Sequence, residues 1–446
     1  MSKYTTQNWY LPQRHTKPGL TAYVNARLFD PATGLDVMGA LITDGDKIVD
    51  FGAGLLQENM PEGARIIDCD NHLLCPGLLD IQVHFREPGQ AHKETLESGS
   101  KSAASGGITT VVCQPNTKPV IDDVVQMEFL KSRARETAYI NITTYASISK
   151  NMEGKELTDM GKLVEAGAVG FTYDGLPVMN SLLMRRALTY SSMFNVPIAQ
   201  HAEDLQLSQG GCMNEGPTSF ALGVTGIPNI SESVMVERDI AILALTGGHY
   251  HVLHVSTKES LAAIRRGKDQ GLHITCEVAP HHFTLTDQAL LGFNTNAKMN
   301  PPLRSEEDRA ALLAALQDGT IDAIATDHAP HDAASKNVPL ANATFGIVGV
   351  ETMLPLSLAL YHQKLMNLKD LIAKFTCNAA DIISNPSGRL KKGAIADLTL
   401  IDLDHEWVID INNFAGKSNN SPFHAKRVKG RAIKTIVGGQ IVYEYS

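Results

Sequence analysis

Cysteines are scarce in this sequence and form no pattern. The 446 residues contain only six Cys, which are scattered along the chain without a Cys-x-x-Cys pair. That distribution argues against a disulfide framework and predicts free thiols in a reducing cytoplasm.

Long apolar runs and an excess of basic residues are also missing. No uninterrupted apolar stretch is long enough to span a bilayer, and residues 1–7 contain no apolar core of a signal peptide. The formal net charge is -9, whereas a nucleic-acid-binding surface needs concentrated Lys and Arg. We therefore expect a cytoplasmic protein with no membrane or nucleic-acid partner. A small anionic substrate stays open, because it needs only one local Arg.

What the chain does contain is a repeated alternation of short β-rich runs and helix-like stretches. The β-rich runs lie at 73–85, 109–115, 139–148, 169–174, 198–203, 250–256, 273–280 and 322–330. The helix-like stretches include 122–138, 180–195, 231–247, 258–271 and 305–318. Eight such units over about 250 residues predict an α/β protein with a (β/α)₈ barrel of the TIM type. The alternative is a doubly wound open sheet, which predicts a Gly-rich phosphate loop after an early strand. The sequence has none placed that way.

The two ends of the chain differ from this middle. Residues 20–72, and near the C-terminus 396–402 and 432–443, have the pattern of short strands separated by turns. We therefore predict one small β-sandwich-like domain built from both termini, covering residues 1–75 and 385–446. The barrel is predicted over residues 76–384.

Polar side chains gather where the predicted barrel strands end. Catalytic groups in such barrels lie at the C-terminal ends of strands, and five of the eight strands end with a His or Asp: His84, Asp174, His201, His254 and Asp327. One His at a strand end is more often structural, but five on one rim are hard to explain by chance. His and carboxylate ligands without Cys suit zinc or another divalent first-row metal. Asp174 could bridge two metals, and Asp327 could hold one while handling a proton.

Short motifs follow one another in a fixed order along the chain. They are His84-Phe85-Arg86-Glu87-Pro88-Gly89, Pro115-Asn116-Thr117, Phe171-Thr172-Tyr173-Asp174-Gly175, His201-Ala202-Glu203-Asp204, His254-Val255-Ser256-Thr257, Ala279-Pro280-His281-His282, Met299-Asn300-Pro301-Pro302, Thr326-Asp327-His328-Ala329-Pro330-His331 and Phe345-Gly346-Ile347-Val348-Gly349. From about residue 75 to the C-terminus, their order and spacing resemble bacterial class I dihydroorotase, of the amidohydrolase superfamily. Each motif alone is moderate evidence, whereas the ordered series is specific.

The resemblance implies a metal-dependent cyclic amidohydrolase. Such an enzyme reversibly hydrolyses (S)-dihydroorotate to N-carbamoyl-L-aspartate in de novo pyrimidine biosynthesis. By resemblance, His84, Asp174, His201, His254 and Asp327 match metal ligands, and Asp327 is also the catalytic base and then acid. The residues that match substrate contacts are Arg86, Asn116 and His331 for the carboxylate, and Asn300 with the Phe345 and Gly346 backbone for the ring amide edge.

Two positions depart from the family pattern. Gln82 stands where the family has the first His of His-x-His, and Tyr173 stands where many members have an Asp. A Gln oxygen is a weaker ligand than imidazole for a borderline-soft metal. Gln82 is therefore a doubtful ligand: it leaves one metal position weak or empty, or it ligates through oxygen, or it marks an inactive subunit. Because the substrate-side residues remain, we expect an active enzyme with one or two zinc ions per chain, one of them more fully occupied.

Other functions and partners stay open at this point. One alternative is an inactive dihydroorotase-like subunit that scaffolds aspartate carbamoyltransferase. The other is a hydantoinase- or allantoinase-type hydrolase, although these relatives carry a Lys where this chain has Asp174. A homodimer is the expected assembly. The polar segment 331–345 directly follows the last predicted strand and could close over substrate as a lid.

Overall fold

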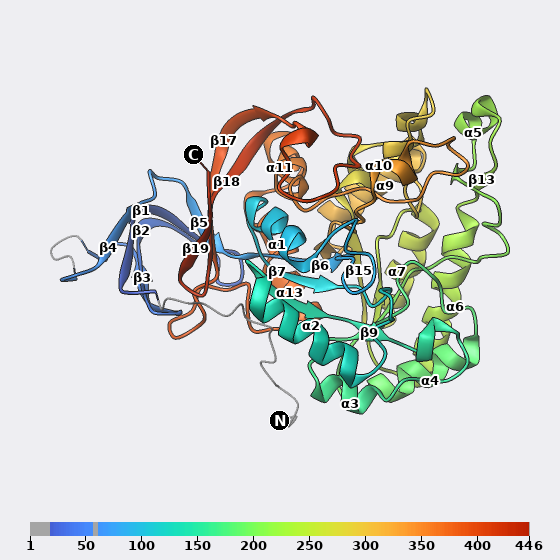
Figure 1. Cartoon of the computed structure of the whole chain (residues 1–446), viewed down its shortest axis with the longest axis horizontal. Coiled ribbons are helices and arrows are strands. Elements are labelled where there is room, and N and C mark those ends of the chain that lie inside the picture. The colour runs from blue at the N-terminus through green and yellow to red at the C-terminus, as the bar shows by residue number, and fades with distance from the viewer. Residues whose placement is uncertain (1–17, 57–60, 446) are drawn as a thin grey trace.

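The computed structural model describes residues 18–56 and 61–445. Residues 1–17, 57–60 and 446 of the predicted β-domain lie outside the described residues, and so does the segment 1–7, from which no signal peptide is expected. A β-rich unit lies on one side of the molecule and a larger α/β unit on the other (Figure 1). Blue strands from the beginning of the chain and red strands from its end lie together in the β-rich unit.

The β-rich unit is one hydrogen-bonded sheet of eight strands, built from both ends of the chain. Its strands are β1 (Thr21–Asp30), β2 (Leu35–Asp44), β3 (Lys47–Gly52), β4 (Arg65–Asp68), β5 (Leu73–Pro76), β17 (Leu398–Val408), β18 (Arg427–Val437) and β19 (Gln440–Glu444). Their order is β19-β18-β17-β5-β1-β2-β3, with β4 paired to β1. Apolar side chains such as Tyr23, Leu41 and Leu398 form a separate core there.

The first predicted barrel strand, 73–85, is wrong as a single element, because it divides at Gly77. Residues Leu73–Pro76 pair with β17 in the terminal sheet, and the next strand, β6 (Leu78–Val83), pairs with β7 (Ile108–Cys113). A side chain at position 77 would place its Cβ 2.1 Å from Thr109 Oγ1. Only glycine fits this close approach, so the chain can pass from one sheet to the other there.

Parallel strands form the framework of the α/β unit. One set is β6, β7 and β8 (Asn141–Thr144). The other is β9 (Ala146–Ser147), β10 (Phe171–Thr172), β11 (Ile198–Gln200), β14 (Tyr250–Val252), β15 (Ile274–Val278) and β16 (Ala323–Ile324). Only Tyr145 separates β8 from β9, and a parallel bridge joins Val83 to His328 just beyond β16. All eight predicted β-rich runs thus contain a strand, and each pairs with the next.

Helices follow most of these strands and cover them. The longer ones are α1 (Leu96–Ser105), α2 (Val124–Thr137), α4 (Ser181–Ser191), α6 (Ile230–Thr246), α7 (Lys258–Asp269), α9 (Glu306–Gln317) and α11 (Met353–His362). The five predicted helical stretches coincide with α2, α4, α6, α7 and α9. Asp123, Asn180, Thr257 and Ser305 cap helix N-termini with their side chains. Within the described ranges, no helix is both long and apolar enough to cross a membrane.

Candidate functional site

Five buried side chains meet where the parallel strands end. His84 follows β6, Asp174 follows β10, His201 follows β11, His254 follows β14 and Asp327 follows β16. They form two groups able to hold a metal ion, and Asp174 belongs to both. The five residues selected from the sequence are thus brought together by the fold.

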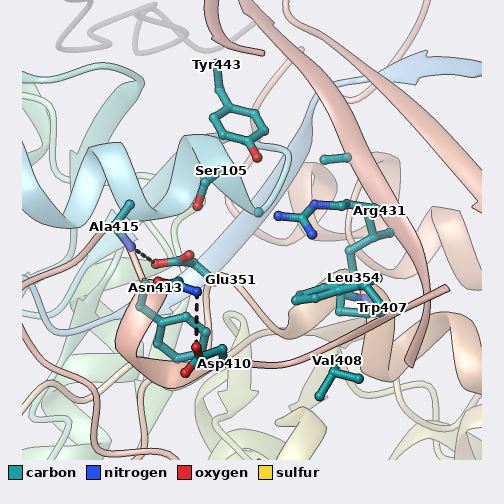
Figure 2. Close-up of a pocket in the computed structure, with 14 residues that line it drawn as sticks. Ser105, Glu351, Leu354, Trp407, Val408, Asp410, Asn413, Ala415, Arg431 and Tyr443 are labelled. Carbon is teal, nitrogen blue, oxygen red and sulfur yellow. Dashed lines mark hydrogen bonds between the residues drawn. The ribbon is translucent and has the colours of Figure 1, made fainter. Parts of the chain in front are cut away.

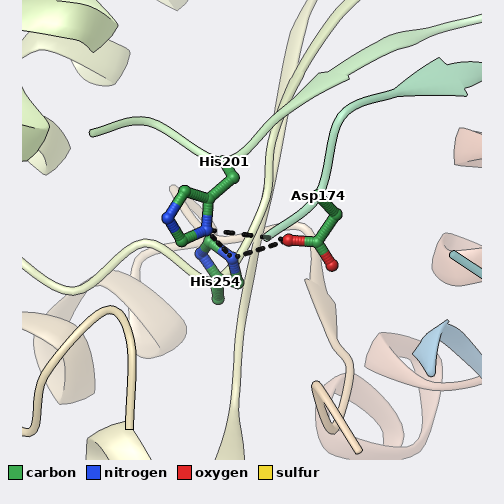
Figure 3. A group of neighbouring side chains, drawn as sticks. All are labelled: Asp174, His201 and His254. Carbon is green, nitrogen blue, oxygen red and sulfur yellow. Dashed lines mark hydrogen bonds and ion pairs between the residues drawn. The ribbon is translucent and has the colours of Figure 1, made fainter. Parts of the chain in front are cut away.

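The first group consists of Asp174, His201 and His254 (Figure 3). Asp174 Oδ1 lies 3.3 Å from His254 Nε2 and 3.6 Å from His201 Nδ1. The two imidazole nitrogens lie 3.0 Å apart. Three donor atoms therefore point at one small volume, and two nitrogens with one carboxylate oxygen suit zinc and similar divalent metals.

Glu203 orients the His201 ring. Its Oε2 lies 3.1 Å from His201 Nε2 and accepts a hydrogen bond of 3.0 Å from Asn300 Nδ2. Burial, the largest single effect, would raise the pKa of Glu203, but the hydrogen bond and charge of His201, together with hydrogen bonds from Ser208 and Asn300, outweigh it and lower the pKa to about 2. A carboxylate at Nε2 keeps the ring proton on that nitrogen and leaves Nδ1 free as a ligand. Sequence reasoning gave Glu203 no role, although it stands two residues after a predicted ligand.

The second group consists of His84, Asp174 and Asp327. His84 Nε2 lies 3.1 Å from both Asp174 Oδ2 and Asp327 Oδ1. Its other nitrogen, Nδ1, lies 3.0 Å from Asn116 Oδ1. Burial alone would lower the pKa of His84, but the two carboxylates outweigh it and raise the pKa to about 9. These two acidic groups therefore strongly favour a positive charge between them.

Gln82 turns the N–H side of its amide towards the shared carboxylate. Its Nε2 donates a hydrogen bond of 2.8 Å to Asp174 Oδ2. Among the described residues, its Oε1 has no hydrogen-bond partner. An amide N–H cannot ligate a metal, so in this arrangement Gln82 positions Asp174.

Tyr173, the second departure from the family pattern, takes no part in either group. Its hydroxyl accepts a hydrogen bond of 3.0 Å from the backbone N–H of Gly154. The phenol therefore fastens a neighbouring loop, and the change from Asp leaves both groups intact.

The strand ends that carry the site are held in unusual backbone conformations. The φ angles of His254 and Asp327 are 32° and 48°, in the left-handed region that residues other than glycine rarely adopt. Buried Asp80 connects the first and last parallel strands. Its Oδ1 accepts hydrogen bonds from Gln82 N at 3.2 Å and Thr326 N at 3.0 Å. The sequence signal for Asp80 was a lone carboxylate inside an apolar run.

Arg86 and His331 form a polar pair beside the metal-binding groups. Arg86 Nε donates to Pro330 O at 3.2 Å, and its Nη2 lies 3.4 Å from His331 Nε2. Burial lowers the pKa of Arg86 to about 10, so it stays charged at neutral pH. Burial and Arg86 lower the pKa of His331 to about 2, so its ring is neutral. Because Nε2 faces a donor, the ring proton belongs on Nδ1, which has no partner within the described part of the chain.

The remaining predicted substrate contacts lie close by. Asn300 Nδ2 lies 3.4 Å from His201 Nε2, next to the first group. Lys298 Nζ lies 4.5 Å from the centre of the Phe345 ring, and the backbone N–H of Gly346 already donates to Lys298 O at 3.0 Å. The Gly346 N–H is therefore engaged and is not free for a substrate in this conformation.

The predicted lid, 331–345, is an ordered segment that contains the short helix α10 (Ala333–Lys336). Buried Lys336 fastens it, since its Nζ donates to Thr344 O at 2.9 Å and to Gly346 O at 3.0 Å. Closure of this segment stays a prediction.

Known proteins resemble this chain closely in sequence and fold. Residues 71–260 match the family model described as Dihydro-orotase-like. The chain is 57% identical over 441 residues to the dihydroorotase of Ehrlichia chaffeensis, covering 98% of each chain. It is 58% identical over 441 residues to the dihydroorotase of Wolbachia sp. subsp. Brugia malayi, covering 98% of this chain and 99% of the relative. Among solved structures, the L-hydantoinase (dihydropyrimidinase) from Arthrobacter aurescens shares the fold, with a TM-score of 0.85, 24% identity and coverage of 95% and 96%.

Proposed function

We propose that this chain, which belongs to the dihydroorotase family and is a cyclic amidohydrolase, reversibly hydrolyses dihydroorotate to N-carbamoyl-L-aspartate in de novo pyrimidine biosynthesis. One observation carries the proposal: a buried His and carboxylate cluster lies beside a guanidinium–imidazole pair. A cyclic amide resists attack by neutral water, so its hydrolysis needs groups that activate the water. A carboxylate on the ring needs a cation to bind it. The chain places the cluster and the cation side by side at the ends of its parallel strands.

The fold that we propose for this activity is a (β/α)₈ barrel over residues 76–384. The small domain from residues 1–75 and 385–446 packs beside it. Support comes from the sequential parallel pairing of the strands and from the Val83–His328 bridge between the first and last of them. The similarity to the Arthrobacter aurescens hydantoinase supports the same architecture.

We propose zinc as the metal, with Asp174, His201 and His254 forming the better-filled position. The donor set fits, since these three ligand atoms converge and Glu203 fixes the ligand nitrogen of His201. His84, Asp174 and Asp327 form a weaker second position, because Gln82 supplies no imidazole there. When bound, a divalent metal would polarise the amide carbonyl and lower the pKa of water.

Asp327 is the proposed proton carrier. Its buried carboxylate lies in the cluster, where a water attacking the amide carbonyl would approach. It would accept a proton from that water and donate it to the ring nitrogen as the C–N bond breaks. In the reverse direction it would take the proton back from the carbamoyl nitrogen, so the same residue serves both directions.

Arg86, His331 and Asn116 are the proposed partners of the substrate carboxylate. The planar guanidinium pairs with a carboxylate through two parallel N–H bonds. The Nδ1–H of His331, which has no partner among the residues that the structure describes, adds a third donor. Asn116 lies alongside, with its Oδ1 bound to His84. Asn300 and the Phe345–Gly346 segment would contact the amide edge of the ring.

We propose that the protein is a cytoplasmic homodimer that acts on a small molecule. Aspartate carbamoyltransferase is the further partner to test. An inactive scaffold is less consistent with the site, because only Gln82 departs from the ligand set. A hydantoinase is less consistent too, since Asp174 replaces the carboxylated Lys of those relatives and an Arg is placed for a carboxylate.

Metal content and dihydroorotate hydrolysis, measured on the same sample, test the proposal. We expect turnover that is lost after chelation and restored by zinc or manganese. A chain with neither metal nor turnover would overturn the enzymatic proposal. Faster hydrolysis of uncharged cyclic ureides than of dihydroorotate would favour the hydantoinase alternative.

A further inference from the structure

Asn420 lies at the centre of a small hydrogen-bond cluster on the substrate side of the site. It belongs to the segment between β17 and β18 and is 3% exposed. Its Nδ2 donates to Ala329 O at 3.0 Å and to Gly346 O at 2.9 Å. Its Oδ1 accepts a hydrogen bond of 3.0 Å from the backbone N–H of His331. One amide therefore ties together the two chain segments that carry His331 and Gly346.

The same segment holds the loop that follows the first parallel strand. Lys417 Nζ donates to Ala91 O at 2.9 Å, and its backbone N–H donates to Glu94 Oε1 at 3.3 Å. Ser418 Oγ donates to Lys93 O at 2.8 Å. Residues 417–420 thus contact the loops after both the first and the last parallel strands, which carry Arg86 and His331.

The beginning of this segment is fixed in a small pocket (Figure 2). The pocket, of about 200 Å³, has Glu351, Trp407 and Arg431 among its lining residues. The backbone N–H of Ala415 donates to Glu351 Oε1 at 2.8 Å (Figure 2). Ser102 Oγ donates to the same oxygen at 2.6 Å. Residues 415–420 are therefore held at both ends.

We propose that Asn420 is a positioning residue for the substrate carboxylate, acting through His331 and Gly346. This inference rests on the proposed function. Asn420 fixes the backbone of His331, whose ring lies 3.4 Å from the Arg86 guanidinium. A Cβ on Gly346 would lie 2.6 Å from His331 Cδ2, so even a small shift of Gly346 would displace that ring.

The chemistry of the amide explains why asparagine is needed. Two carbonyl oxygens and one N–H surround the side chain. Among side chains of this length, only asparagine presents an N–H₂ to the former and an oxygen to the latter. Aspartate has the same shape but no donor, so it would face Ala329 O and Gly346 O with a negative oxygen. The two segments would then move apart and the Arg86–His331 pair would lose its spacing.

Asn420→Asp tests the proposal, with Asn419→Asp as the matched control. Asn419 is adjacent but exposed, so its variant changes the local charge equally without touching the cluster. We expect Asn420→Asp to raise the KM for dihydroorotate at least about tenfold, because the loss of one hydrogen bond weakens binding by about this factor. The kcat and the metal content should stay close to wild type, and the control should match wild type throughout.

Other outcomes separate the two proposals. A fall in kcat at unchanged KM, or no change at all, would overturn the positioning role of Asn420. If Asn420→Asp does not fold, Asn420→Ala is measured in the same way. Failure of both variants to fold would leave Asn420 a purely structural residue and would also overturn the inference. A wild-type chain without dihydroorotate turnover would instead count against the proposed function.

Discussion

Gln82 Nε2 donates a hydrogen bond of 2.8 Å to Oδ2 of Asp174, the carboxylate that both candidate metal groups share. A histidine at position 82 would present a lone pair to a metal, whereas this amide presents a proton. The bond holds one carboxylate oxygen of Asp174 and leaves Oδ1 facing His201 and His254. The group with His84 and Asp327 therefore lacks this imidazole, and we expect it to hold a metal more weakly than the group with His201 and His254.

The Gln82→His substitution should restore the weaker metal position. The added imidazole would complete the ligand set of the group formed by His84, Asp174 and Asp327. We expect the zinc content to rise from about one to about two ions per chain after loading and extensive dialysis. Elemental analysis of the dialysed protein measures this directly, whatever the activity of the variant.

An added histidine on the surface controls for adventitious binding. Gln288 is exposed and far along the chain from the cluster, so Gln288→His should leave the metal content unchanged. Equal metal content in wild type and Gln82→His would mean that Gln82 does not limit the second position.

Replacing Asp327 by Asn should remove the proton carrier while keeping the first metal group. Asparagine keeps the size of the side chain but cannot accept the proton of the attacking water. We expect kcat to fall roughly 10²- to 10⁴-fold, the usual contribution of a general base. Steady-state assays in both directions measure the effect, and the control is Asp269→Asn on the exposed end of α7. Loss of all bound metal together with activity would show instead that Asp327 is mainly a ligand.

Arg86→Lys keeps the charge beside His331 but removes the planar fork. A lysine can make only a point contact with a carboxylate and cannot also donate to Pro330 O as Arg86 Nε does. We expect the KM for dihydroorotate to rise by about ten- to a hundredfold. The binding of dihydrouracil, an uncharged analogue without the carboxylate, should change little. A similar loss for both compounds would argue that Arg86 stabilises the loop without contacting the substrate.

Much of the candidate site could be predicted because each proposed ligand is marked by its own local sequence. Each of the five, which are His84, Asp174, His201, His254 and Asp327, lies within three residues of the end of a buried strand. Parallel strands bring such positions to one rim. The family resemblance then supplied the roles. In the structure, side-chain atoms of the five separated motifs lie close together in two groups that share Asp174.

What could not be predicted depends on contacts between distant segments. The direction of the Gln82 amide is set by Asp174, and the role of Asn420 by backbone groups of Ala329, His331 and Gly346. An asparagine in a loop gives no local sign of such partners. The division at Gly77 was missed because an apolar run does not reveal which of two sheets it joins.

Asp80 should make the stability of the protein depend on pH. Burial raises the pKa of this carboxyl from 3.8 to about 7, even though it accepts hydrogen bonds from Gln82 and Thr326. Because the folded pKa lies above the unfolded one, the favourable contribution of protonated Asp80 is complete below pH 3.8 and is lost as the pH rises through about 7. Asparagine at this position keeps a neutral side chain at every pH. The free energy of unfolding of wild type, relative to Asp80→Asn, should therefore fall by a few kcal/mol, to order of magnitude, between about pH 4 and about pH 8. Urea unfolding of both metal-free proteins across that range measures the difference, and parallel curves would show that Asp80 is already ionised in the folded state at low pH.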